Sequence, residues 1–143
     1  MRALPRRRAV ARALLACLVA AGVITGRPAA ARPLDEVTAS GVLRVAIYDD
    51  NRPFSEAGTA GPRGIDADLA RAIAERLKLK LDLRVVDAGE NVDGDFRLNL
   101  WRGDLAGTPL ADLMLHVPHD RILATRNEQL FLTNPYFEQR LAF

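Results

Sequence analysis

The sequence predicts an α/β fold with an open, mostly parallel sheet and flanking helices. Three short apolar segments, 43–47, 81–86 and 111–115, have the length and composition of strands buried on one or both faces. Helical patterns separate these segments, so the order along the chain is strand, helix, strand, helix, strand. That alternation favours a parallel sheet over a helical bundle or a sandwich of antiparallel sheets.

The first 31 residues are predicted to be a secretory signal peptide. This segment contains six arginines and no acidic residue, and its apolar run from 13 to 25 is followed by the small residues Ala29–Ala31. The run is shorter than the ~20 residues that a bilayer crossing requires. We therefore expect cleavage of the signal, export to the periplasm and no stable membrane span afterwards. Three arginines at 6–8 leave open whether export uses the Sec or the twin-arginine pathway.

Loss of the signal peptide changes the charge and excludes several classes of function. Removing its six arginines from the 20 basic residues leaves 14 against 18 acidic residues, so the net charge changes from +2 to −4. The remaining chain has no basic cluster interleaved with aromatic residues, so we expect no nucleic-acid partner. The single cysteine, Cys17, lies in the signal peptide, which excludes disulfides and thiol catalysis from the domain. The remaining residues, 32–143, are enough for one small domain.

Local patterns predict the helices. The segment 34–40 is weakly helical and ends at Gly41, whereas 65–77 is the clearest helix because apolar residues recur in it at four-residue spacing. Asp66 lies at the start of that helix and is explained more readily as a cap than as a ligand contact. The other predicted elements are a short helix at 96–102, a helical turn at 122–126 and extended segments at 129–132 and 139–143.

Four local motifs follow one another along the chain. They are the strand 43–47 with Pro53-Phe54 after it, Gly64-Ile65-Asp66-Ala67-Asp68-Leu69 at the clearest helix, Asp112-Leu113-Met114 in the third strand, and Thr133-Asn134-Pro135-Tyr136-Phe137. In this order they resemble the family 3 periplasmic solute-binding proteins, the receptors of polar amino acid ABC transporters. The resemblance runs from Leu43 to nearly the end of the chain. It implies the fold of the first lobe of a type II periplasmic binding protein, a small-molecule ligand and a transporter permease as a partner.

The same resemblance implies that half of such a receptor is missing. These receptors have two lobes that close on the ligand, and their first lobe leaves for the second just after the segment that corresponds to 140–143. The chain ends there, so we expect a truncated or stand-alone first lobe over 32–143, with the second lobe absent.

A narrower likeness gives an alternative function. The segments 96–103 and 112–118 resemble a subgroup of these proteins encoded beside periplasmic quinoprotein dehydrogenases of the methanol type. That likeness implies an accessory periplasmic protein that associates with such a dehydrogenase.

Candidate ligand contacts lie in the loops that follow the strands, because open α/β sheets bind ligands beyond the carboxyl ends of their strands. The resembled receptors stack an aromatic residue of the first loop on the ligand. Asn51 stands at that position here, with Tyr48 and Phe54 nearby. Phe96 is a second candidate for stacking, although a core contact explains it equally well.

The resemblance also implies an arginine that clamps a carboxylate through two parallel hydrogen bonds, and it places Arg126 there. His116 and Val117 stand where the receptors usually have small hydroxyl residues, and Pro118 has no amide hydrogen to donate. The ligand is therefore expected to be a small polar or carboxylate-bearing solute, with amino acid specificity left open. The candidate ligand-binding residues are Tyr48, Asn51, Phe54, Phe96, His116, Val117 and Arg126.

His116, His119 and Asp120 raise two further alternatives, a metal site and a general base. Two histidines three residues apart in a loop are a weak metal-binding pattern. No motif places a nucleophile beside them, which argues against a hydrolase or lyase. We therefore expect no catalytic residue, no metal and no cofactor.

Overall fold

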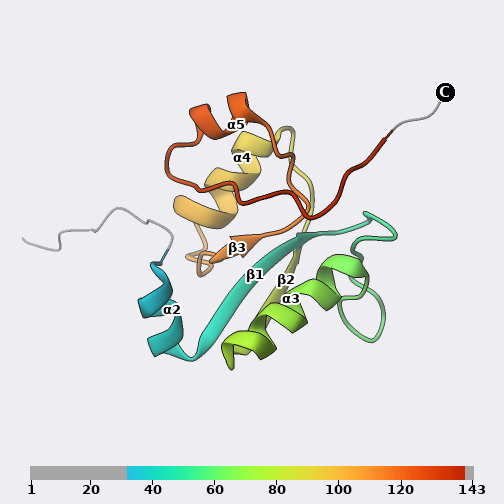
Figure 1. The fold of residues 1–143 in the computed structure, drawn as a ribbon, viewed down its shortest axis with the longest axis vertical. Coiled ribbons are helices and arrows are strands. Elements are labelled where there is room, and N and C mark those ends of the chain that lie inside the picture. The colour runs from blue at the N-terminus through green and yellow to red at the C-terminus, as the bar shows by residue number, and fades with distance from the viewer. Residues whose placement is uncertain (1–31, 141–143) are drawn as a thin grey trace, which may run out of the picture.

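The computed structural model describes residues 32–140 and confirms the predicted α/β fold (Figure 1). The predicted signal peptide at 1–31 and the last three residues of the predicted segment 139–143 lie outside the described residues. The elements in chain order are α2 (Leu34–Ser40), β1 (Val42–Tyr48), α3 (Ile65–Leu77), β2 (Lys80–Val86), α4 (Val92–Phe96), the π-helix η1 (Arg97–Trp101), β3 (Leu113–Met114) and α5 (Arg121–Arg126).

The three described strands form a parallel sheet in the order β2-β1-β3. β1 pairs with β2 along its whole length, from Val42 beside Lys80 to Tyr48 beside Val86. β3 is shorter than the predicted strand 111–115, because the amide of Ala111 donates to the Asn99 carbonyl of η1 (2.8 Å) instead of joining the sheet. All three strands run in one direction, so the loops that follow them leave from the same edge, as predicted.

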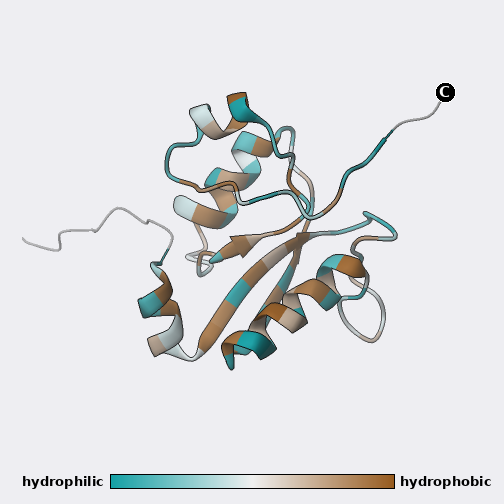
Figure 2. Ribbon diagram, viewed as in Figure 1, coloured by the Kyte–Doolittle hydropathy of each residue, from teal (hydrophilic) through white to brown (hydrophobic). Residues whose placement is uncertain are grey.

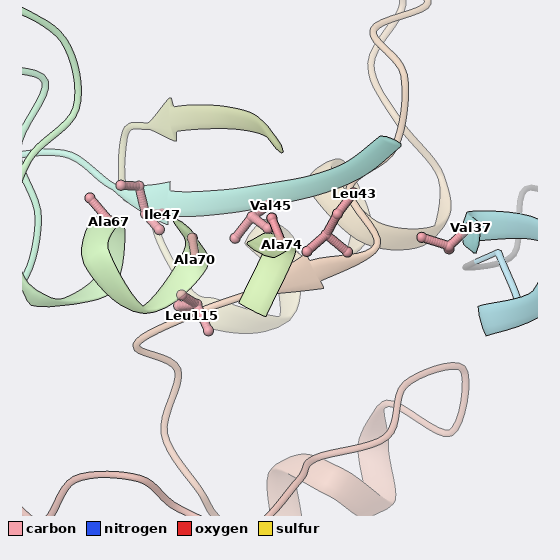
Figure 3. Packing of buried hydrophobic residues seen from close by; sticks show 8 residues of the cluster. All are labelled: Val37, Leu43, Val45, Ile47, Ala67, Ala70, Ala74 and Leu115. Carbon is pink, nitrogen blue, oxygen red and sulfur yellow. The ribbon is translucent and has the colours of Figure 1, made fainter. Parts of the chain in front are cut away.

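One face of the sheet packs against α3 (Figure 3). Val45 and Ile47 of β1 are fully buried there, opposite Ala67, Ala70 and Ala74 of the helix. These alanines are three and four residues apart and therefore share one side of the helix. Their short side chains let the helix backbone approach the sheet, and the branched side chains of β1 fill the space between them.

The opposite face of the sheet is covered by α4, η1 and α5 (Figure 1). Ala46 and Tyr48 of β1 point to this face because side chains alternate along a strand. Phe96, Leu100 and Met114 complete this second apolar cluster. β1 is therefore buried on both faces, as its continuous apolar run predicts.

The distribution of polar and apolar residues agrees with this packing (Figure 2). Apolar residues dominate β1, whereas α3 alternates between apolar and hydrophilic residues around its circumference, as expected for a helix with one buried side. Within residues 32–140, no helix combines the length and the apolar character that a membrane crossing would require.

The second helical segment starts earlier than the predicted helix 96–102. α4 begins at Val92 and passes directly into η1, which ends at Trp101. Asn91 accounts for the early start, because its side chain accepts a hydrogen bond from the amide of Gly94 (2.8 Å) and so caps the helix. Residues 92–95, which precede the predicted helix, are therefore helical as well.

The predicted extended segment 129–132 is not a strand. The side chain of Asn127 is buried, and its amide donates to the carbonyl of Leu123 (2.9 Å) and to the carboxylate of Asp93. The amide of Leu130 then donates to the carbonyl of Asn127 (2.9 Å). These bonds turn the chain at 127–130, so it passes over the second apolar cluster without joining the sheet. Residues 139 and 140 also lie outside any strand.

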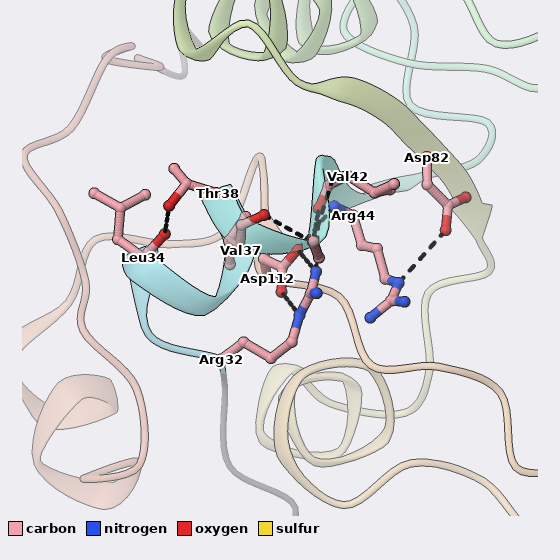
Figure 4. A network of polar contacts seen from close by, with 9 residues as sticks. Arg32, Leu34, Val37, Thr38, Val42, Arg44, Asp82 and Asp112 are labelled. Atoms are coloured by element: carbon pink, nitrogen blue, oxygen red, sulfur yellow. Dashed lines mark hydrogen bonds and ion pairs between the residues drawn. The ribbon is translucent and has the colours of Figure 1, made fainter.

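Arg32 fastens the start of the described chain to the sheet (Figure 4). Its guanidinium donates to both carboxylate oxygens of Asp112, at 2.9 and 2.7 Å, and to the carbonyl of Val42 (3.2 Å). Asp112 also accepts from the amide of Arg44 (2.9 Å). The hydrogen bond to Asp112 raises the pKa of Arg32 further above its usual value. We call this pair of residues the Arg32–Asp112 clasp.

Candidate functional site

The candidate site lies at the edge of the sheet where all three strands end. The loops 49–55, 87–91 and 115–120 leave from this edge, after β1, β2 and β3 respectively. The amide of Asp49 donates to the carbonyl of Val86 (2.9 Å) and so holds the first loop beside the end of β2. This edge is the usual location of a ligand site in an open α/β sheet.

The first loop is held in place by its own turn and by the start of α3. The carbonyl of Asn51 accepts hydrogen bonds from the amides of Phe54 (2.8 Å) and Ser55 (2.9 Å). The carbonyl of Phe54 in turn accepts from the amide of Asp66 (2.9 Å). Gly64 lies against this carbonyl with φ 115°, a conformation that favours glycine. The loop therefore presents the Phe54 ring at a fixed position.

The ring of Phe54 packs against that of His116 at an angle of 39°, and a buried carboxylate lies beside that histidine. The centroids of the Phe54 and His116 rings are 4.1 Å apart. Asp66 is fully buried, and its Oδ2 lies 3.5 Å from Nδ1 of His116. The hydroxyl of Tyr136 donates to Oδ1 of Asp66 (2.9 Å) and accepts from the amide of His116 (2.8 Å). We call Asp66, His116 and Tyr136 the carboxylate cluster.

An open groove runs past the carboxylate cluster. One side is formed by His116, Val117 and the loop to His119, and the other by the segment 135–139. Phe137 meets the edge of Phe54, with ring centroids 4.9 Å apart. The groove is therefore bordered by aromatic rings and by imidazoles, which can stack on a flat solute and donate hydrogen bonds to it.

Two predicted site residues, Tyr48 and Phe96, belong to the second apolar cluster, on the face of the sheet covered by α4, η1 and α5. The Tyr48 hydroxyl donates to Oδ2 of Asp95 (2.9 Å), whose Oδ1 accepts from the amide of Gly89 (3.0 Å). Phe96 is 1% exposed in the second apolar cluster. It also lines a separate, mostly apolar hollow of about 360 Å³, which it shares with Val117.

Arg126 lies apart from the groove. It is the last residue of α5, its side chain is 60% exposed, and its guanidinium pairs with Asp93 at 3.2 Å. Asp93 belongs to α4, which follows the loop after β2. The structure thus places His116 and Val117 in the lining of the groove, with Phe54 packed against His116. Arg126 lies at the end of α5, which covers the second face of the sheet. Asn51 shapes the first loop through its backbone.

Three residues of this site, Asp66, Tyr136 and Phe137, were not predicted from the sequence to contact a ligand. Asp66 was expected to cap α3, but no side chain caps that helix, and the Asp66 carboxylate accepts from Tyr136 instead. Tyr136 and Phe137 were part of a motif without an assigned role. Asp66 and Tyr136 are 70 positions apart in the sequence, and no local pattern predicts a contact over that separation. The only indication in the sequence was that Asp66 and Tyr136 each belong to one of the four motifs.

The two tyrosines of the chain allow a direct test of these contacts by alkaline titration. Burial, together with a hydrogen bond to a carboxylate, raises the pKa of Tyr48 and of Tyr136 above the ordinary value. The stability that this contributes is complete below the ordinary phenol pKa of about 10 and is lost as the pH rises through the higher folded-state values. We expect no phenolate absorbance from the folded protein at about pH 10.5, and titration of both phenols near pH 10 in urea. Tyr48→Phe and Tyr136→Phe assign the signals, and a phenol that titrates near pH 10 in the folded protein would show that its carboxylate contact is absent.

Comparisons with known proteins give partial matches. No protein-family model matches the chain. Among curated proteins, the membrane-bound lytic murein transglycosylase F of Aliivibrio fischeri is 38% identical over 50 residues, which are 35% of this chain and 10% of that protein. The chain therefore spans about a tenth of this curated relative.

Several solved structures are similar over less than half of the chain. An ancestral cationic amino acid solute binding protein is 36% identical over 46% of this chain and 27% of its own, with a TM-score of 0.38. The arginine-bound domain 1 of ArgBP from T. maritima is 34% identical over 46% of this chain and 50% of its own, with a TM-score of 0.37. The cysteine-binding protein from Campylobacter jejuni is 31% identical over 42% of this chain and 26% of its own, with a TM-score of 0.37.

These structures are mostly of amino-acid-binding proteins, the class that the motifs of the chain resemble. An ancestral cyclohexadienyl dehydratase, 36% identical over 41% of this chain and 24% of its own with a TM-score of 0.36, is an exception. The chain spans from about a quarter to half of these solved chains. The absence of enzymatic activity stays a prediction.

Proposed function

We propose that the chain is a periplasmic solute-binding protein of the family 3 type, which binds a small polar or carboxylate-bearing solute for an ABC-type transporter. The observation that carries the proposal is the open groove between loop 115–120 and segment 135–139 at the carboxyl edge of the sheet, with Phe54 of loop 49–55 in contact with both His116 and Phe137. Open α/β sheets bind their ligands at this edge. The four motifs in their order support the same function, and the predicted signal peptide supports export.

The groove has features suited to a small flat or polar solute. Phe54 is buried and fixes the position of the His116 ring, whereas Phe137 is half exposed beside it. An exposed aromatic ring next to a fixed one offers apolar contact at low conformational cost, and the imidazoles offer donors. The groove is open to solvent on one side, and a transporter or a further domain would cover that side during transport.

Isothermal titration of the purified protein with the twenty amino acids and a set of small carboxylates tests the proposal. We expect measurable binding of at least one solute and about tenfold weaker binding after Phe137→Ala, which removes an aromatic contact at the groove. Phe131→Ala is the matched control, because Phe131 is 87% exposed and does not line the groove. The absence of binding heat throughout the panel, or equal losses in both variants, would contradict this function.

A further inference from the structure

We propose that His116, supported by Asp66, makes the groove selective for solutes that carry a carboxylate beside a flat apolar group. His116 would then take the role that the resemblance assigns to Arg126. This inference rests on the proposed solute-binding function and adds to it the residue that determines specificity and the class of solute.

The first observation is the unsatisfied oxygen of a buried carboxylate. Asp66 is 0% exposed, and its Oδ2 has no hydrogen-bond partner among the described residues. A buried carboxylate with an unpaired oxygen is unfavourable. Within residues 32–140, the basic group within ion-pair distance of this carboxylate is the imidazole of His116, with Nδ1 3.5 Å from Oδ2. His116 is therefore the basic side chain that lies against the unpaired oxygen of Asp66.

The second observation is the free nitrogen on the other side of the same ring. Nε2 of His116 makes no hydrogen bond to another described residue, and the ring lines the groove. In an imidazolium both nitrogens carry hydrogen, so one N–H can face Asp66 while the other is available to an anion. A hydrogen bond from a charged donor to a carboxylate is stronger than one between neutral groups.

The third observation is that Arg126 is not available to the groove. It pairs with Asp93 at the end of α5, and it is not one of the residues that line the groove. The described residues that line the groove include no lysine or arginine, so its basic side chains are His116 and His119. Asp66 lies behind His116 and has no ion pair with His119, which distinguishes the two imidazoles.

The remaining groups around His116 define the rest of the solute. Phe54 packs against its ring, and the Tyr136 hydroxyl accepts its amide hydrogen. Phe137 and two prolines, Pro118 and Pro135, border the groove. Glu138 also lines the groove, but it pairs with Arg140 at 3.0 Å. Rings and prolines favour a flat apolar body, and the carboxylate of the solute would meet His116.

A pair of probes of nearly the same shape, phenylacetate and phenylacetamide, tests the proposal because the amide lacks the negative charge of the acid and has an NH2 group in place of one oxygen. At about pH 6 we expect the acid to bind about tenfold more tightly than the amide. His116→Asn should reduce this ratio to about one. Asparagine is chosen because His116 has φ 57°, a left-handed conformation that asparagine accepts more readily than most residues. A purely structural role of His116 would weaken both probes equally and leave the ratio unchanged.

His119→Asn is the matched control, and the ratio should stay within about twofold of that of the unmodified protein. The inference is overturned if the amide binds as tightly as the acid, if the ratio survives His116→Asn, or if His119→Asn removes it as well. These outcomes differ from a failure of the proposed function, in which no member of the full solute panel binds. If other solutes bind without any preference for the acid probe, the selectivity of His116 is refuted and the receptor function stands.

Discussion

Replacement of Gly64 by alanine is expected to lower the free energy of unfolding by about 4 kcal/mol, the sum of roughly 2 kcal/mol for backbone strain and roughly 2 kcal/mol for overpacking. Gly64 has φ 115° and ψ 177°, a combination adopted almost exclusively by glycine. A methyl group at this position would also overlap the carbonyl oxygen of Phe54. That carbonyl accepts the amide hydrogen of Asp66, so relief of the overlap would move the first loop away from α3.

Gly61→Ala separates these two effects. Gly61 has φ 111°, and a methyl group added there would meet no atom within 4 Å. This variant should therefore show the strain without the overlap, a loss of about 2 kcal/mol. Urea denaturation of both variants measures the difference. Equal losses of stability in the two variants would mean that Phe54 does not pack against Gly64 as described.

Asp112→Asn is expected to lower the free energy of unfolding by about 3 kcal/mol, because it leaves the largely buried charge of Arg32 without its ion-pair partner. The side chains of the clasp are 17% exposed for Arg32 and 6% for Asp112. Asparagine has almost the same shape as aspartate and keeps one oxygen for the amide of Arg44, so the loss reports chiefly on the ion pair.

Asp82→Asn is the matched control for the clasp. Asp82 pairs with Arg44 at 3.9 Å, and its side chain is more exposed than that of Asp112 (Figure 4). Exposed ion pairs contribute little, so a loss of no more than about 0.5 kcal/mol is expected. Thermal and urea unfolding of the two variants provide the measurement. If Asp112→Asn were no more harmful than Asp82→Asn, the clasp would not stabilise the start of the domain.

The parts of the fold that depend on local patterns could be predicted from the sequence. The helix over 65–77 has the predicted bounds, because its apolar residues repeat with the helical period and face one side of the sheet. β1 and β2 were predicted to within a residue or so at each end. The segment 129–132 was wrongly predicted as extended, because its turn depends on the contact between Asn127 and Asp93, 34 residues earlier.

The candidate site could be predicted in its location but not in its contacts. The alternation of strands and helices places three loops at one edge, and Phe54, His116 and Val117 are found there. The sequence could not show that Arg126 pairs with Asp93. Such contacts depend on how helices pack across a sheet, and spacing along the chain carries no information about them.

Several expectations from the sequence stay predictions. These are the cleaved signal peptide, the periplasmic location, the missing second lobe and the accessory role beside a quinoprotein dehydrogenase. Co-purification of the protein with such a dehydrogenase would favour the accessory role over transport.

The stretch from Leu130 to Phe137 belongs to neither helix nor strand, yet it touches both sides of the sheet. Leu130 and Leu132 pack against the cluster under α4, whereas Tyr136 and Phe137 contact Asp66 and Phe54 beside α3. The stretch, which we call the belt, thus connects the two apolar clusters of the domain through its side chains. Both apolar clusters include residues of β1 and the belt contacts both, so we expect the domain to unfold as one cooperative unit.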